Sequence, residues 1–120
     1  MNVSDDTLVI VRGINSDWLQ QNFTDMWVGF GGNPVAIPKE DAYFVGFYLE
    51  APISAITHLG IVERIERDAE EAIFYIKAII KLQTPYIPDH QIRKHVYYHL
   101  DDFGFSKPQA DILRLILSNI

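Results

Sequence analysis

The middle of the chain contains three strand-like segments in succession, residues 43–49, 56–66 and 72–82. The first segment is almost wholly apolar, which is typical of a strand buried on both faces, and its Gly46 indicates a bulge or a close approach of another backbone. In the third segment, apolar residues occupy every second position and so share one face. Short connections between such segments favour antiparallel pairing. The three segments therefore predict a bent, mostly antiparallel sheet or a pseudo-barrel.

The residues before these segments predict a strand, a helix and a loop. Residues 7–11 form a short β-branched run that ends at an Arg-Gly pair, as a buried strand before a turn does. Asn15 is a candidate N-cap, and apolar residues then recur near helical spacing as far as Met26, so a helix is expected there. The glycines and the proline of residues 29–34 cannot continue this helix, and they predict the longest loop of the chain.

The residues after the three segments predict a break, a short strand and a final helix. Two prolines within residues 84–88 forbid a continuous sheet strand. Residues 95–100 favour a strand, because three β-forming side chains lie together there. A capping box and an apolar stripe predict a helix over residues 106–120. The predicted fold class is α+β: one domain over residues 1–120, with N- and C-terminal helices flanking the sheet or pseudo-barrel.

Composition restricts where the chain works and what it binds. The chain has no cysteine, which excludes a disulfide framework, a thiolate zinc site and a cysteine nucleophile. It shows no signal-peptide pattern and no run of about 18 apolar residues, so we expect a cytoplasmic protein without a membrane partner. The net charge of −6 opposes indiscriminate binding to nucleic acid, yet residues 72–100 hold four basic side chains and one acidic side chain. A locally basic surface is therefore expected on an acidic protein.

One interpretation of Ser54 and His58 is a nucleophile and its base, with Glu63 or Glu66 orienting the histidine. The chain lacks the G-x-S-x-G pattern, however, and on a strand His58 and Glu63 point to opposite faces. A small hydrolase that uses His58 as its general base is therefore kept only as an alternative.

Two further patterns give no support to a cofactor or a metal. Residues 29–34 match neither glycine-rich nucleotide motif, and they follow a predicted helix rather than a strand. His90, His95 and His99 lie close together in the sequence, but on a strand His95 and His99 would be about 13 Å apart, too far to share one ion. We therefore predict no cofactor, no metal site and no catalytic residue.

Aromatic side chains are more numerous than a core of this size needs for filling. The set comprises Trp18, Trp27, Phe30, Tyr43, Tyr48, Tyr86, Tyr97 and Tyr98. Tryptophan and tyrosine prefer half-buried positions, and they also stack on the bases of splayed single strands or flipped nucleotides. Two interpretations account for them: packing in the core and at its rim, or an aromatic ligand pocket.

The central segments resemble the strand pair of PUA-like domains of the EVE and ASCH kind. The resemblance covers residues 43–66, continues through residues 73–82 and includes the Thr84-Pro85 pair that follows. It implies a small pseudo-barrel with flanking helices that binds RNA or a modified base in an aromatic-lined pocket. The positions from which such a pocket would draw its lining are Trp27, Tyr48, Ser54, Thr57 and His58, with Arg93 or Lys94 available for phosphate.

The leading hypothesis is therefore a non-catalytic binding module that recognises RNA or a modified nucleobase. Its nucleic-acid partner would bind beside the basic residues of 72–100. The alternative, besides the small hydrolase, is a protein–protein interaction or homo-oligomerisation domain that docks through an exposed apolar edge or through the terminal helix of residues 112–120.

Overall fold

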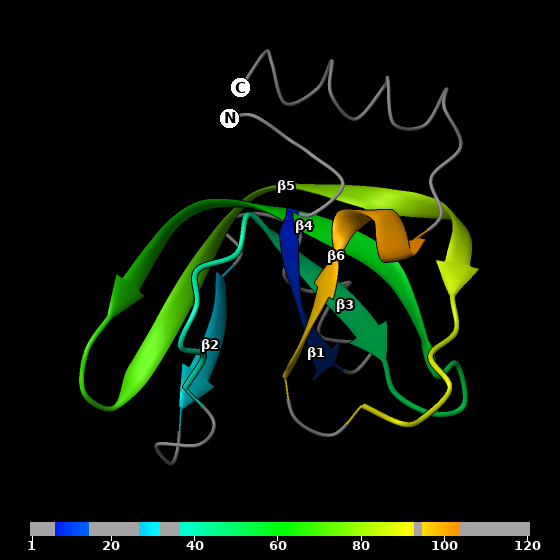
Figure 1. Ribbon diagram of the computed structural model, residues 1–120, viewed down its shortest axis with the longest axis horizontal. Coiled ribbons are helices and arrows are strands. Elements are labelled where there is room, and N and C mark those ends of the chain that lie inside the picture. The colour runs from blue at the N-terminus through cyan, green and yellow to red at the C-terminus, as the bar shows by residue number, and fades with distance from the viewer. Residues whose placement is uncertain (1–6, 15–26, 32–36, 93–94, 104–120) are drawn as a thin grey trace.

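The computed structural model describes residues 7–14, 27–31, 37–92 and 95–103. The strands are β1 (Leu8–Ile14), β2 (Trp27–Gly31), β3 (Phe44–Leu49), β4 (Ala55–Arg67), β5 (Glu71–Tyr86) and β6 (Val96–His99), and a 3₁₀ helix, η2, spans Leu100–Phe103. The strands form one sheet in the order β2-β5-β4-β3-β1-β6. The two longest strands, β4 and β5, arch over β1, β2 and β3 in Figure 1.

The α+β prediction is wrong, because the described residues form a curled six-stranded sheet and contain no α-helix. The sheet is mixed: β1 pairs parallel with β3, while the other neighbouring strands pair antiparallel. Part of the expected glycine-rich loop is strand β2, which lies at the edge of the sheet and pairs only with β5. The helices expected over residues 15–26 and 106–120 lie outside the described residues.

The predicted strands are confirmed at all five positions, with somewhat different bounds. The expected antiparallel pairing of β4 with β5 is also confirmed. All six residues of β3 are buried, as its apolar sequence predicted. A strand with neighbours on both edges and side chains packed on both faces has no surface left for polar residues, which explains the uninterrupted apolar run.

Strand β5 runs as far as Tyr86, so the break predicted over residues 84–88 begins later than expected. The pairing of β4 with β5 jumps from Ile56–Tyr86 to His58–Lys81, which leaves an irregular stretch of β5 between Lys81 and Tyr86. Pro85 lies in this stretch. Its missing N–H therefore removes no regular ladder hydrogen bond, and the proline is tolerated in the strand.

Two hydrophobic clusters occupy the two faces of the sheet. Along β1, Ile10 and Ile14 belong to one cluster, whereas Val9 and Val11 belong to the other, as alternation along a strand requires. The first cluster also contains Phe30 of β2, although three strands separate β2 from β1 in the sheet. Only a sheet curled around this face brings the two strands together. We call the first cluster the inner cluster and the second the outer cluster.

Strand β5 changes face midway, which the sequence pattern did not reveal. Ala72, Phe74 and Ile76 pack in the inner cluster, whereas Ala78, Ile80 and Leu82 pack in or against the outer cluster. The pairing register with β4 shifts on either side of Val62, opposite this change. A register shift of one residue reverses which face the following side chains take. The prediction that all six residues share one face is therefore wrong.

Gly46 lies at a tight point of the sheet. A Cβ atom at Gly46 would lie 2.9 Å from Cγ2 of Val11 on the neighbouring strand β1. The glycine thus accommodates close side chains, and the predicted close approach of another backbone is wrong. A register shift between Phe47 and Tyr48 follows immediately, so the irregularity predicted at this glycine lies one residue further along β3.

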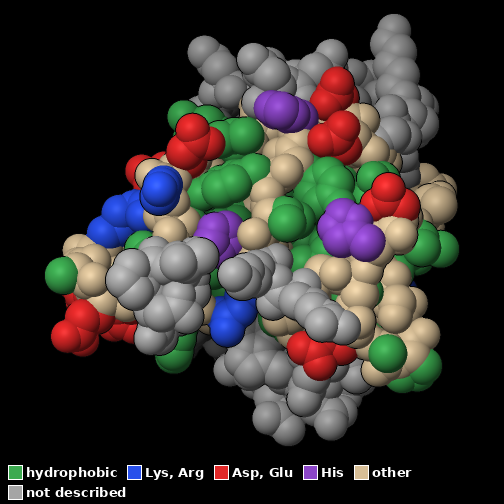
Figure 2. Space-filling model, turned by 60° about the horizontal axis from the view of Figure 1, so that its bottom comes forward, with side chains coloured by type: hydrophobic (Ala, Val, Ile, Leu, Met, Phe, Trp, Pro, Cys, Tyr) green, Lys and Arg blue, Asp and Glu red, His purple; other side chains and the backbone are tan. Residues whose placement is uncertain are grey.

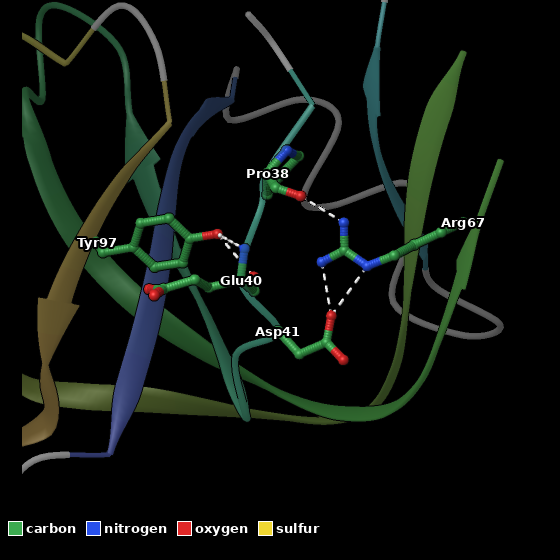
Figure 3. Close-up of polar contacts among 5 residues, drawn as sticks. All are labelled: Pro38, Glu40, Asp41, Arg67 and Tyr97. Atoms are coloured by element: carbon green, nitrogen blue, oxygen red, sulfur yellow. Dashed lines mark hydrogen bonds and ion pairs between the residues drawn. The ribbon is translucent and has the colours of Figure 1, made fainter. Parts of the chain in front are cut away.

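The connection before β3 is tied to both β6 and the end of β4 (Figure 3). The hydroxyl of Tyr97 donates to the carbonyl oxygen of Glu40 at 2.6 Å and accepts the Glu40 N–H at 3.1 Å. Arg67 donates to Asp41 Oδ1 from Nε at 2.9 Å and from Nη2 at 2.6 Å, and to the carbonyl oxygen of Pro38. These bonds hold a strap of residues 37–43, whose Ala42 packs in the inner cluster.

Candidate functional site

A cavity of about 400 Å³ lies between β1, β2 and the turn after β3. Its volume falls within the range of small-molecule sites, roughly 300–1,000 Å³. The residues that line it are Arg12, Gly13, Ile14, Trp27, Val28, Gly29 and Glu50. It combines an indole ring, a guanidinium and a carboxylate with the backbone of two glycines. We call this cavity the Arg12–Trp27 pocket.

Arg12 forms one wall of the pocket. Its Nη1 donates a hydrogen bond to the carbonyl oxygen of Gly29, and its guanidinium carbon lies 5.3 Å from the centre of the Phe30 ring. Partial burial lowers the pKa of Arg12 from its ordinary value, but an arginine remains protonated at neutral pH. The side chain thus brings a positive charge to the pocket while joining β1 to β2.

Trp27 also lines the pocket and is 54% exposed. Its ring lies against Gly29: a Cβ atom at that position would be 3.2 Å from Cζ3 of the indole. A side chain at position 29 would therefore push the ring away, so the glycine gives the indole its place. A large aromatic ring with more than half of its surface exposed is available to stack on a planar ligand.

Glu50 supplies the carboxylate. Its backbone N–H donates to the carbonyl oxygen of Ile14 at 3.1 Å, which fixes the start of the turn beside the end of β1. Its Oε1 lies 3.7 Å from the point where a Cβ atom at Gly13 would stand. The absence of a side chain at Gly13 leaves this carboxylate beside the strand, and Glu50 itself is exposed. The pocket thus offers both a hydrogen-bond donor group and an acceptor group.

The structure brings only one of the predicted site residues, Trp27, into this pocket. Tyr48 is 1% exposed and packs in the outer cluster, with its Cδ1 3.8 Å from a Cβ at Gly13, so it supports the pocket from behind. Ser54 lies in the turn between β3 and β4 with a φ of 52°. Arg93 and Lys94 lie outside the described residues.

Thr57 and His58 form a separate feature on β4. The Thr57 hydroxyl lies 2.7 Å from Nδ1 of His58. Burial, and then the positive charge of Lys81 on β5, lower the pKa of His58. Trp27 pairs with Tyr75 of β5, whereas His58 pairs with Lys81, six residues further along that strand and thus about 20 Å away. Trp27 and His58 therefore do not meet in one pocket, contrary to the set implied by the resemblance.

The carboxylates considered for a hydrolytic triad bind elsewhere. Glu63 lies 3.5 Å from Nη1 of Arg64, and Glu66 lies 3.4 Å from its Nε. Glu66 also accepts a hydrogen bond from the hydroxyl of Tyr75 at 3.1 Å. Both glutamates thus belong to an exposed group around Arg64, and the His58 ring lies against the Thr57 hydroxyl. The geometry gives no support to the hydrolase alternative.

The histidines near β6 lie in unrelated contacts. His90 pairs with Asp89 at 2.8 Å, and the ring of His95 lies edge-on to Phe30 and Tyr97 at centroid distances of 5.8 and 6.0 Å. Within the described ranges, no group of three or more His, Cys, Asp and Glu side chains is arranged to hold a metal ion.

Acidic side chains are spread around the edge of the face shown in Figure 2, while histidines lie beside a central group of hydrophobic side chains.

The sequence did not predict Arg12 and Glu50 as site residues. A signal for both was present, because each is the first charged residue after an apolar run that the sequence identified as a strand. What placed them together is the parallel pairing of β1 with β3, which matches Gly13 to Tyr48 and Ile14 to Leu49.

In comparisons with protein-family models, curated proteins and solved structures, no match to this chain was found. The resemblance to PUA-like domains therefore stays a prediction. No helix in the part of the chain that the structure describes is long and apolar enough to cross a membrane.

Proposed function

We propose that this chain is a non-catalytic binding module that takes a nucleobase of RNA, or a modified nucleobase, into the Arg12–Trp27 pocket. The observation that supports it is a cavity of about 400 Å³ in which a half-exposed indole stands beside a guanidinium and a carboxylate. The proposal places the protein in the cytoplasm, because a chain without cysteine has no disulfide to form in an oxidising compartment.

Each wall of the pocket has a function in base recognition. The indole of Trp27 offers a stacking surface, and stacking of a base on an aromatic side chain contributes about 1–3 kcal/mol. A guanidinium has five N–H donors in a fixed fork, and the bond to Gly29 engages one of them. The others suit the carbonyl oxygens of a base or a phosphate. The carboxylate of Glu50 suits the amino and imino N–H groups of a base edge.

The acidic charge of the chain is compatible with this mode of binding. A protein that covers a duplex neutralises many phosphates, and a net charge of −6 opposes that. A pocket that accepts one unstacked base needs few phosphate contacts, since its specificity comes from the base edge and from stacking. We therefore expect binding to single strands with a shallow dependence on salt.

The direct test is fluorescence anisotropy of labelled single-stranded RNA, single-stranded DNA and duplex DNA, each with and without modified bases. We expect selective binding to one single-stranded or modified probe, and a loss of about tenfold or more with Trp27→Ala. Tyr43→Ala is the matched control, because Tyr43 is 52% exposed, close to the 54% of Trp27, but does not line the pocket.

Equal affinities of the wild type and Trp27→Ala for every probe would contradict the proposal, as would an equal loss with Tyr43→Ala. If no probe binds at tens of micromolar protein, above the usual range of specific sites, the protein-interaction alternative becomes the better hypothesis. Of the two docking surfaces of that alternative, the terminal helix of residues 112–120 lies outside the described residues.

A further inference from the structure

One row of side chains crosses four strands of the sheet. Arg12 of β1 pairs with Phe47 of β3, Phe47 pairs with His58 of β4, and His58 pairs with Lys81 of β5. Residues directly opposite one another in neighbouring strands point to the same side of a sheet. Phe47 belongs to the inner cluster, so the three nitrogen-bearing side chains share the inner side with it.

Two contacts confirm this orientation. The Arg12 guanidinium lies over the ring of Phe30, a member of the inner cluster. A Cβ atom at Gly60, two residues after His58 on β4, would meet Cε2 of Phe47 and Cγ2 of Ile76 at 3.0 Å each, and both side chains belong to the inner cluster. Residues two apart on a strand point the same way, so His58 also faces inward.

The spacing of strands sets the distances along this row. Neighbouring strands lie about 4.8 Å apart, so the backbones of His58 and Lys81 are about 5 Å apart and that of Arg12 is about 10 Å from His58. One small group can therefore contact both His58 and Lys81. The Arg12–Trp27 pocket begins at the other end of the row. Because Trp27 lies about 20 Å from His58, a single nucleotide cannot reach both, whereas a strand of several nucleotides can.

A bulge positions His58. Thr57 has no register partner on β3 or on β5, because the pairing of β4 passes from Ile56 to His58 on both sides. Such an extra residue bends a strand and re-aims the neighbouring side chains. It places the Thr57 hydroxyl 2.7 Å from Nδ1 of His58. When the hydroxyl donates to Nδ1, the ring proton is on Nε2, which then faces a ligand as a donor.

His58 and Lys81 together favour an anion. Among the described residues, no salt bridge joins either side chain to a carboxylate; the acidic partners are held by Arg64, Arg67 and His90. The positive charge of Lys81 also disfavours protonation of His58. An anion bound between them would offset the repulsion between Lys81 and a protonated His58, and it would accept hydrogen bonds from both groups.

We infer that His58 and Lys81 form a phosphate-binding pair, and that the strand whose base enters the Arg12–Trp27 pocket places one of its other phosphates, a few nucleotides from the bound base, at this pair. This inference rests on the proposed function, and it deepens it by naming the ligand as a strand of several nucleotides rather than a free base, nucleoside or single nucleotide. His58 is thereby assigned to phosphate binding, which differs from the base-lining role that the resemblance implies.

The first test uses the tightest-binding probe of the anisotropy experiment and copies of it in which one phosphate at a time is a neutral methylphosphonate. We expect Lys81→Gln and His58→Gln to weaken binding of the unmodified probe by about tenfold. At one linkage, a few nucleotides from the recognised base, the methylphosphonate should weaken binding to the wild type by a similar factor and leave binding to the Lys81→Gln variant unaffected. Lys77→Gln is the control, since it removes the same charge from β5 outside the row.

The second test follows the His58 ring by NMR during pH titration, with and without inorganic phosphate. We expect phosphate to raise the pKa of His58 in the wild type and to have a smaller effect in Lys81→Gln. An unchanged pKa of His58 in the presence of phosphate would overturn the inference. So would a Lys81→Gln variant that loses as much affinity for the methylphosphonate probes as for the unmodified probe. A pKa rise without any methylphosphonate effect would indicate a site for free phosphate, and would also overturn the assignment to a strand.

The two proposals fail separately. If Trp27→Ala loses binding while Lys81→Gln and His58→Gln keep wild-type affinity, the pocket proposal is supported and the phosphate-binding pair is contradicted. Unchanged binding in Trp27→Ala would remove the proposed function, and with it the assignment of the pair to a nucleotide in a strand.

Discussion

The guanidinium of Arg12 on β1 donates a hydrogen bond to the carbonyl oxygen of Gly29 on β2, although three strands separate β1 from β2 in the sheet. The contact joins the two sides of the curled sheet at the point where they come together without a ladder of backbone bonds. It also makes one wall of the Arg12–Trp27 pocket. The closure of the sheet and the formation of the pocket therefore depend on the same side chain.

Replacing Arg12 by alanine should destabilise the protein as well as weaken ligand binding. A hydrogen bond from a charged group contributes about 1.5–3 kcal/mol, and the partly exposed position of Arg12 places the expected loss near the lower end. Urea denaturation measures this loss as a lower midpoint with an unchanged slope. Arg12→Lys keeps the charge but loses the planar fork of donors, so its midpoint should lie between those of the wild type and Arg12→Ala. An Arg12→Ala midpoint equal to that of the wild type would show that the bond does not stabilise the closure.

Gly46→Ala should destabilise the fold through overpacking. The new methyl group would lie 2.9 Å from Cγ2 of Val11 in a buried part of the sheet, and crowding of this kind costs about 1–3 kcal/mol. Gly13→Ala is the control on β1, because its nearest neighbour would be 3.4 Å away, at the Ile92 carbonyl oxygen. Thermal unfolding should show a clear drop in Tm for Gly46→Ala and a small change for Gly13→Ala. The reverse order would contradict the packing described for β3.

The strap of residues 37–43 should open when Tyr97 loses its hydroxyl. Tyr97→Phe removes both hydrogen bonds to the Glu40 backbone while keeping the ring, at an expected cost of about 1 kcal/mol. Hydrogen exchange at the Glu40 amide should become faster, because its acceptor is gone. Tyr43→Phe, on an exposed ring outside this contact, should leave that rate unchanged. An unaltered exchange rate in Tyr97→Phe would mean that the strap is held by other contacts.

His58 should make the protein less stable in mild acid. Its pKa in the folded state is lowered by burial and by Lys81, so between that value and about 6.5 the unfolded chain binds the proton more readily. The free energy of unfolding contributed by His58 is therefore fully present above about pH 6.5 and is lost as the pH falls through that window. Unfolding curves of the wild type and His58→Gln at a series of pH values isolate this contribution. A difference between them that is constant with pH would contradict it.

The sequence predicted the strands better than their arrangement. The apolar run of β3 and the alternation in β5 are local patterns, and both correctly indicated strands. The change of face in β5 depends on shifts in its register with β4, which no pattern within β5 records. The parallel pairing of β1 with β3 was missed for a similar reason, since it depends on where the intervening chain leads. Part of β2 was predicted to be a loop because glycine usually interrupts regular secondary structure. In the structure, the missing side chain of Gly29 makes room for the Trp27 ring.

The candidate site was predicted only in part. Trp27 was identified by its residue type, and the structure places it at the pocket. Tyr48 was proposed for the same pocket, but its face of β3 packs in the outer cluster. Arg12 and Glu50 were not considered, because their approach depends on the parallel pairing of β1 with β3 rather than on their distance in the sequence. The link between His58 and Lys81 likewise comes from strand register alone.

The measurement that tests the central claim most directly is an NMR titration of the isotope-labelled chain with the RNA or modified probe that binds best. If a base enters the Arg12–Trp27 pocket, the Trp27 indole N–H and the Gly29 and Gly13 amides should shift together and saturate at one dissociation constant. Amides that do not line the pocket, such as that of Glu70 in the turn between β4 and β5, should not move. Shifts confined to other surfaces, with the Trp27 indole signal unchanged, would contradict the account.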